Sequence, residues 1–152
     1  LVADDAFNGG EFFMRARGRG VPDPSLADID VMADGASKPI ADNSRFARLG
    51  TGTKLGQVSV GNELVRVFII TNRGTTQALT FSGSMITLSG SNAGSFRLDT
   101  TGMALSLAAG ESTTFRLIAS PGSPGKQAAR VSITTNDLDE PEFDFKVSVL
   151  AV

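Results

Sequence analysis

The sequence predicts an all-β protein, an antiparallel two-sheet β-sandwich of roughly seven to eight strands with an extra N-terminal strand extension. Runs of alternating apolar and polar residues recur about every 8 to 12 residues, which is the spacing of strands in a sandwich. Glycine or proline stands at the corners between many of these runs. No stretch sustains the period near 3.6 residues that an amphipathic helix requires.

The best-defined strand is Leu64–Thr71, whose β-branched and aromatic residues are typical of a central strand. The turn that follows, residues 72–76, contains Gly74, which we expect to supply a positive φ. Alternation in two later strands directs four side chains toward the core: Phe115, Leu117, Val131 and Ile133. The expected strands are, in order, residues 11–18, 25–33, a strand at Val58, 64–71, 78–81, 86–88, 95–98, 103–107, 112–119, 128–134 and 143–149.

The strand expected at residues 11–18 repeats the pattern of the strand that ends the chain. The matched pairs are Phe12 with Phe143, Met14 with Phe145, and Ala16 with Val147, and both runs begin with glutamate. One sandwich needs one closing strand, and a spare strand with an apolar face is suited to complete another sheet. We therefore expect Phe12, Phe13, Met14 and Ala16 to bind a partner as a donor strand.

This interpretation divides the chain into an N-terminal strand extension and hinge, residues 1–24, and a β-sandwich, residues 25–152. The hinge is Gly18–Pro24, where glycines precede two prolines that favour extended backbone. Residues 25–33 fit either a helix or a strand, and Ile29 and Val31 favour the strand.

The composition excludes several classes of function. The 152 residues include no cysteine, histidine, tryptophan or tyrosine, so haem, zinc and copper sites of the usual nitrogen and sulfur type are excluded, as are Ser-His-Asp and Cys-His catalysis. We expect no enzymatic activity and no cofactor.

A net charge of −2 argues against nucleic acid as a partner, and Arg15, Arg17 and Arg19 are expected to form a solvated strand face. No apolar run approaches the ~20 residues of a membrane span, so no membrane insertion is expected.

Two acidic groups qualify as candidate metal sites. The loop Asn136–Glu140 offers several oxygen ligands of the kind that calcium prefers. Its spacing lacks the order of an EF-hand loop, and we expect a solvated turn with Asx hydrogen bonds, with calcium binding at Asp137–Glu140 as the alternative. The second group is expected to be the outer face of a strand, because Ile29 points the other way; its members are Asp23, Asp28, Asp30 and Asp34.

A series of segments follows the order of a known repeat. These segments are Ile29–Val31, Pro39–Asp42, Leu55–Gly61, Phe68–Gly74, Ile86–Phe96, Leu107–Phe115 and Val131–Asp137, continuing to Phe145. They resemble the immunoglobulin-like repeats of bacterial choice-of-anchor D surface proteins, relatives of the ASPM/SPD-2/Hydin domain. The resemblance implies an immunoglobulin-like fold, secretion, surface display and no enzymatic activity. In such proteins a repeat commonly ends in a strand followed by Gly-x-Gly. Gly18-Arg19-Gly20 matches that junction and Leu150–Val152 does not, so we expect the N-terminus to be the tail of a preceding repeat and Leu150–Val152 to be a true end.

These observations predict a non-catalytic structural subunit of an extracellular filament or cell-surface assembly, on a bacterial cell, that self-associates head to tail through its N-terminal strand. One alternative is an adhesive or binding module of a tandem-repeat surface protein with a protein target on a cell surface. Sugar-binding faces commonly use tryptophan or tyrosine, which this chain lacks. The second alternative is a scaffold of the cilium or centrosome related to the ASPM/SPD-2/Hydin (ASH) domains.

Overall fold

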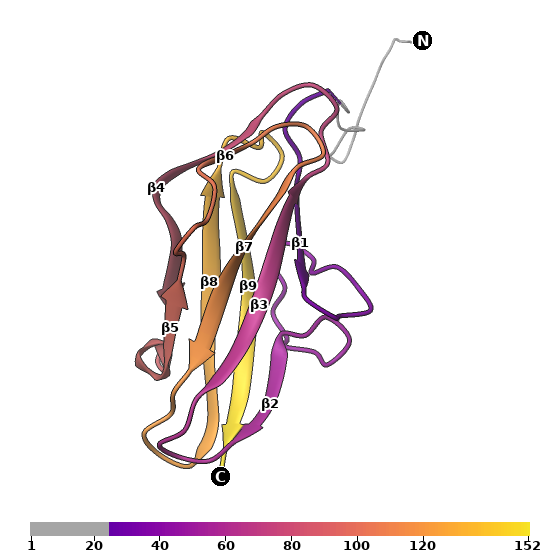
Figure 1. The fold of residues 1–152 in the computed structure, drawn as a ribbon. Helices are drawn as coiled ribbons and strands as arrows, with labels where there is room; N and C mark the ends of the chain where they lie inside the picture. Colours follow the sequence, from indigo (N-terminus) through magenta and orange to yellow (C-terminus); the bar gives the residue numbers. More distant parts are fainter. Residues whose placement is uncertain (1–24) are drawn as a thin grey trace.

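The computed structural model describes residues 25–152, apart from the side chains at positions 83 and 84. These residues form two β-sheets packed face to face (Figure 1). The predicted all-β sandwich is confirmed. The four-stranded sheet has the order β1 (Ile29–Ala33), β3 (Leu64–Asn72), β7 (Ser112–Ala119) and β5 (Phe96–Asp99). The five-stranded sheet has the order β2 (Lys54–Val58), β9 (Glu142–Ala151), β8 (Gly125–Thr135), β4 (Leu79–Ser89) and β6 (Ser106–Leu107), and a single 3₁₀ turn, η1 (Ala93–Ser95), precedes β5.

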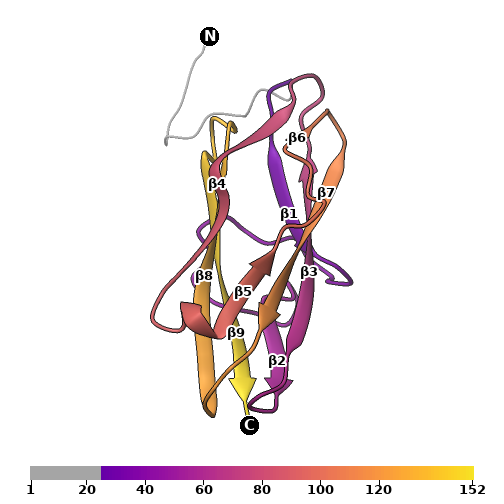
Figure 2. The ribbon, with the colours of Figure 1, turned by 60° about the vertical axis from the view of Figure 1, so that its left-hand side comes forward.

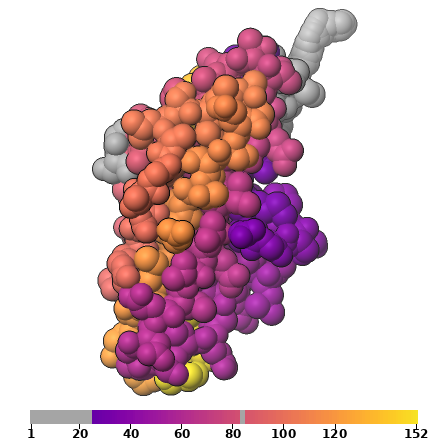
Figure 3. Space-filling view, in the orientation of Figure 1, coloured from indigo at the N-terminus to yellow at the C-terminus, as the bar shows by residue number. Residues whose placement is uncertain are grey.

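The two sheets lie side by side as separate layers when the molecule is turned (Figure 2). Neighbouring strands are antiparallel except β2 and β9, which run parallel. The parallel pair arises because residues 34–53 carry the chain from β1 in one sheet to β2 at the edge of the other. This connection forms a lobe beside the four-stranded sheet, in indigo and violet in Figure 3.

The core lies between the sheets and is centred on phenylalanines from both layers. Phe68 of β3 stacks on Phe115 of β7, with ring centroids 5.4 Å apart, and contacts Phe145 of β9 at the same distance. Such aromatic pairs add about 0.5–1.5 kcal/mol to the free energy of burial. The four residues predicted to face inward, Phe115, Leu117, Val131 and Ile133, are all buried.

Some expected strand boundaries differ from the structure. Residues 78–81 and 86–88, expected as two strands, belong to the single strand β4, whose register against β8 shifts between Phe81 and Ile86. The strand passes this irregularity with Met85 at φ 56° instead of turning back. The expected strand 103–107 is reduced to the two residues of β6, and the expected strand 25–33 begins only at Ile29.

Gly74 lies after β3, as predicted, but serves a different purpose from the one expected. It does not adopt a positive φ. Instead, a Cβ atom at this position would collide with the backbone carbonyl oxygen of Leu26, which passes beside it. The glycine is required because two backbone segments meet here, at the end of the sandwich that carries the acidic residues.

Candidate functional site

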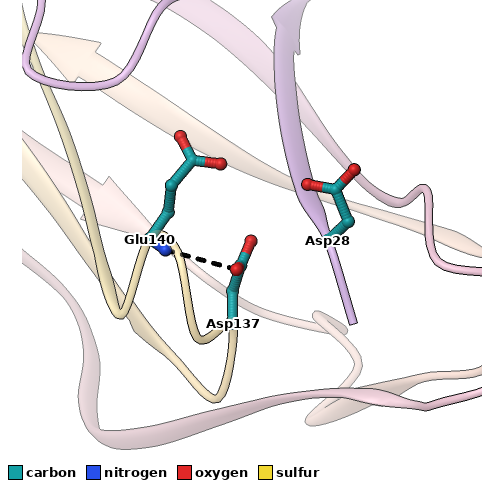
Figure 4. A group of neighbouring side chains, drawn as sticks. All are labelled: Asp28, Asp137 and Glu140. Carbon is teal, nitrogen blue, oxygen red and sulfur yellow. Dashed lines mark hydrogen bonds between the residues drawn. The ribbon is translucent and has the colours of Figure 1, made fainter. Parts of the chain in front are cut away.

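Three carboxylates from distant parts of the chain gather at one end of the sandwich. Asp28 directly precedes β1 in the four-stranded sheet, whereas Asp137 and Glu140 lie in the loop between β8 and β9 of the other sheet. Oxygen atoms of the three side chains all lie within 4.8 Å of one another. Figure 4 shows Asp137 between Glu140 and Asp28, so this acidic end spans the gap between the sheets.

Asp137 is held in place by backbone N–H groups. Asp137 is buried, with only 3% of its surface exposed. Oδ1 accepts hydrogen bonds from the N–H groups of Asp139 (2.9 Å) and Glu140 (3.2 Å). Oδ2 accepts one from the N–H of Ile29 (2.9 Å), and the N–H of Asp137 itself donates to Oγ1 of Thr135 (3.1 Å). Three N–H donors compensate the burial of this carboxylate.

Asn72, at the end of β3, is the second buried polar residue that organises this end of the molecule. Asn72 is fully buried, and its side-chain amide makes four hydrogen bonds. Nδ2 donates to the carbonyl oxygens of Gln77 (2.8 Å) and Leu107 (3.1 Å). Oδ1 accepts from the N–H groups of Asp28 (3.2 Å) and Gly74 (2.9 Å). The amide is therefore fully satisfied and fixes the chain on both sides of β1 and β3.

Negative charge accumulates around Asp28. Burial raises the pKa of the Asp28 carboxyl, and the neighbouring charges of Asp137, Asp30 and Asp139 raise this pKa further, with Arg73 opposing them. The guanidinium of Arg73 lies 3.3 Å from Asp30, which neutralises the outer part of the group. The acidic end therefore combines a buried, hydrogen-bonded carboxylate with a cluster of negative charge that Arg73 partly offsets.

The geometry bears on both interpretations of the acidic groups. The predicted Asx hydrogen bonds in the loop at 136–140 are confirmed, but Asp137 is buried and not solvated as expected. Carboxylate oxygens suit calcium, yet the bonds from Ile29, Asp139 and Glu140 account for the position of Asp137 without an ion. The two acidic groups that the sequence separates meet through Asp28, while Asp34 is exposed and Asp23 lies outside the described residues.

Asn72 was missed by the sequence analysis, which assigned it to a turn. One signal was available, since an asparagine at the end of an otherwise apolar central strand needs partners for its amide when it is buried. The identity of those partners, at Asp28 and Leu107, depends on the tertiary fold.

The predicted donor-strand residues, Phe12, Phe13, Met14 and Ala16, lie outside the described residues, as does the hinge. Their counterparts in β9 are buried, with exposed fractions of 2% for Phe143 and 0% for both Phe145 and Val147. The pattern repeated at the N-terminus is thus that of the core-facing side of the last strand.

Known proteins provide a likeness of fold. No protein-family model matches the chain, and no curated protein matches it. A protein of unknown function from Porphyromonas gingivalis W83 superposes with a TM-score of 0.57 at 16% identity, over 91% of this chain and 52% of that one. The ASH/PapD-like domain of human CEP192 (PapD-like domain 7) gives a TM-score of 0.51 at 14% identity, over 90% of this chain and 92% of that one. The VesB protease of Vibrio cholerae has a TM-score of 0.49 at 15% identity, over 82% and 31%.

The likeness to an ASH/PapD-like domain places the chain in the immunoglobulin-like and PapD-like β-sandwich fold, as the resemblance found in the sequence implies. At these identities it shows the fold alone. The chain spans about half the length of the Porphyromonas gingivalis protein and 31% of VesB. Membership of the choice-of-anchor D proteins stays a prediction. Within residues 25–152, no helix has the length and apolar character needed to cross a membrane.

Proposed function

We propose that this protein is a non-catalytic structural subunit of an extracellular filament or cell-surface assembly of a bacterium, and that it joins its neighbour by donating residues 11–18 as a β-strand. The observation that carries the proposal is the place of β9. That strand already lies inside the five-stranded sheet, between β2 and β8, and buries Phe143, Phe145 and Val147. A second run with the same core-facing pattern therefore cannot take the place of β9, which is paired on both sides, in the same sandwich.

The edge of β4 offers a place for the donated strand. Among the described residues, β6 pairs with β4 only at Leu79 and Thr80, so the outer edge of β4 beyond Phe81 has no neighbouring strand. Beside this edge, Met85 and Leu88 of β4 and Leu98 of β5 are only partly buried against the core. An added strand gains backbone hydrogen bonds from β4 and covers these side chains.

The energetics favour an acceptor that is already folded. Burying one phenylalanine contributes about 1.5–3 kcal/mol, and each inter-strand hydrogen bond adds about 0.5–1.5 kcal/mol. Ordering the donor strand costs about 1–2 kcal/mol per residue. Phe12 and Met14 on one face, laid over the seam between β4 and β5, supply the apolar area that offsets this cost. The hinge at residues 18–24 gives the strand the reach to leave its own domain.

The non-catalytic part of the proposal rests on chemistry. The chain has no histidine or cysteine, and its buried carboxylate, Asp137, is occupied by backbone N–H groups. No acid–base pair, nucleophile or metal-ligand set with an adjoining cleft is apparent in the part of the chain that the structure describes.

Assembly is tested by electron microscopy and sedimentation velocity on the full chain and on a chain lacking residues 1–20. The full chain is expected to form polymers in about 0.5 M salt, because a strand contact depends little on screened charges, and the shortened chain is expected to lose these polymers. Polymers that persist in the shortened chain would contradict strand donation.

A matched pair of substitutions tests which face of the donor strand binds. Phe12→Ser removes an aromatic ring from the face shared with Met14, whereas Phe13→Ser removes the same ring from the opposite face. We expect Phe12→Ser to weaken assembly at least tenfold, which corresponds to about 1.4 kcal/mol, and Phe13→Ser to have a smaller effect. Equal effects would show that the strand does not bind through one face.

A further inference from the structure

The outer face of the five-stranded sheet carries a groove lined with positive charge. Two hollows form it. The first, of about 300 Å³, is lined by Lys54 and Lys126 among other residues. The second, of about 450 Å³, is lined by Arg45, Arg130 and Lys146. Neither hollow has a carboxylate in its lining. They adjoin each other, because Ala128 in the wall of the second pairs with Ser148 in the wall of the first. We call these five cations and the surface between them the basic groove.

Most of these cations lack a counter-charge. Arg130 lies 3.3 Å from the carboxylate of Asp144. The side chains of Arg45, Lys54, Lys126 and Lys146 form no ion pair with another described residue. The whole chain has a net charge of −2, so positive charge is concentrated locally in the basic groove. Such a concentration attracts a negatively charged partner.

An apolar side chain lies in the same groove. Leu150 of β9 is 40% exposed and stands between β2 and β8, where Gln57 and Lys126 are its cross-strand neighbours. The groove is therefore suited to a segment that combines carboxylates with one apolar residue.

The loop from Leu138 to Glu142 is such a segment. Leu138 is 75% exposed, and Asp139 and Glu142 beside it are also exposed. This acidic loop lies at the opposite end of the β8–β9 hairpin from Lys126 and Leu150. β8 has 11 residues. At roughly 3.3 Å per residue, its length separates the acidic loop from Lys126 and Leu150 by about 35 Å. The acidic loop therefore cannot reach Lys126 and Leu150 at the far end of the basic groove of its own molecule.

We propose that the acidic loop of one copy of this chain docks in the basic groove of a second copy, with Leu138 against Leu150 and with Asp139 and Glu142 facing Lys54 and Lys126. The contact joins two different surfaces, so it propagates head to tail. It rests on the proposed function in that copies of the chain meet in an assembly, and it adds a charged contact distinct from the donated strand. Its charge pairs set the orientation of the subunits and the rate at which they meet.

The absence of cysteine from the chain allows a direct test by cross-linking, since introduced cysteines are then the only thiols. Full-length Leu138→Cys keeps an apolar side chain on the acidic loop, and Gln57→Cys places a thiol in the groove. Mixing the two variants with a short bifunctional thiol reagent is expected to yield a covalent heterodimer, and a chain carrying both substitutions is expected to yield a ladder. The control pairs Leu138→Cys with Leu105→Cys, an exposed residue outside the groove. Cross-linking no stronger than in this control overturns the proposal.

Charge reversal then tests the electrostatic contact in the same cross-linking assay. Lys54→Glu with Lys126→Glu in the Gln57→Cys chain, or Asp139→Lys with Glu142→Lys in the Leu138→Cys chain, is expected to reduce the heterodimer at least tenfold. Combining the two reversed chains restores opposite charges and is expected to restore the heterodimer. As a control, Lys38→Glu, at an exposed lysine outside the groove, leaves the yield unchanged. Failure of the restoration would overturn the proposed charge pairs. Displacement of the loop by heparin at equimolar concentration would assign the groove to a polyanion and would also overturn the proposal.

The two proposals fail separately. If Phe12→Ser leaves the polymers intact while the Leu138–Gln57 cross-link forms, strand donation is wrong and the charged contact holds. If Phe12→Ser abolishes the salt-resistant polymers while the cross-link never exceeds its control, the charged contact is wrong and strand donation holds.

Discussion

The carboxylate of Asp137 accepts a hydrogen bond from the backbone N–H of Ile29 at 2.9 Å, across 108 residues of sequence. Asp137 follows β8 in one sheet and Ile29 begins β1 in the other, so this single bond joins the two layers at the acidic end of the sandwich. The same carboxylate orders the β8–β9 loop through two further N–H groups. A residue typical of surface turns is thus buried here and contributes to the stability of the fold.

Asp137→Ala is expected to lower the free energy of unfolding by about 2–4 kcal/mol, because it leaves the N–H of Ile29 buried without an acceptor and removes two bonds from the loop. Denaturant titration followed by circular dichroism measures this. Asp139→Ala, in the same loop but exposed, is the matched control and is expected to change stability by no more than about 0.5 kcal/mol. Equal losses in the two variants would contradict the role given to Asp137.

Asn72→Ala removes the partner of four backbone groups, two N–H and two C=O, at the end of β3. The residue is fully buried, and we expect a loss of about 2–4 kcal/mol in the free energy of unfolding. Asn62→Ala provides the control, because Asn62 is exposed and only its backbone is hydrogen-bonded. Thermal unfolding of the two variants side by side distinguishes a buried amide from a surface one.

The sandwich was predictable because alternation and turn residues are local signals. β7 begins and ends where the sequence places it, and β3 is longer by one residue. The continuity of β4 was not predictable, since Ser82-Gly83-Ser84 has the composition of a turn and only the pairing with β8 shows that the strand continues. The parallel pairing of β2 with β9 likewise depends on residues far apart in the chain.

The candidate site was predictable only in its parts. The Asx bonding of Asp137 follows from its own turn, and the sequence predicts it. The approach of Asp28 to Asp137 does not, because the two lie in different sheets and meet only when the sandwich closes. The basic groove was not predictable for the same reason, since its cations come from separate strands and loops and form no run in the sequence.

Gly74→Ala tests the close approach of two backbone segments. The added Cβ would collide with the carbonyl oxygen of Leu26, and a backbone shift is needed to relieve it, at a cost of about 1–3 kcal/mol. Gly122→Ala is the control, because a Cβ there meets no atom within 4 Å and the residue has no positive φ. Denaturant midpoints are expected to fall for Gly74→Ala and to stay constant or rise slightly for Gly122→Ala.

The ionisation of Asp28 is expected to make stability fall as the pH rises. Burial, followed by the charges of Asp137, Asp30 and Asp139, raises the pKa of Asp28 in the folded protein above its ordinary value of 3.8. Between these two values the folded state holds more protons than the unfolded state, so stability declines as the pH rises through the folded pKa, and the penalty is fully present at pH 7.

Asp28→Asn, which mimics the uncharged carboxyl, should therefore raise the Tm at pH 7 and leave it unchanged near pH 3. Asp30→Asn provides a contrast, because it relieves one of the charges acting on Asp28 but also removes the ion pair with Arg73, and it should therefore give a smaller gain. A lower Tm for Asp28→Asn at pH 7 would show that the charge of Asp28 stabilises the acidic end instead of straining it.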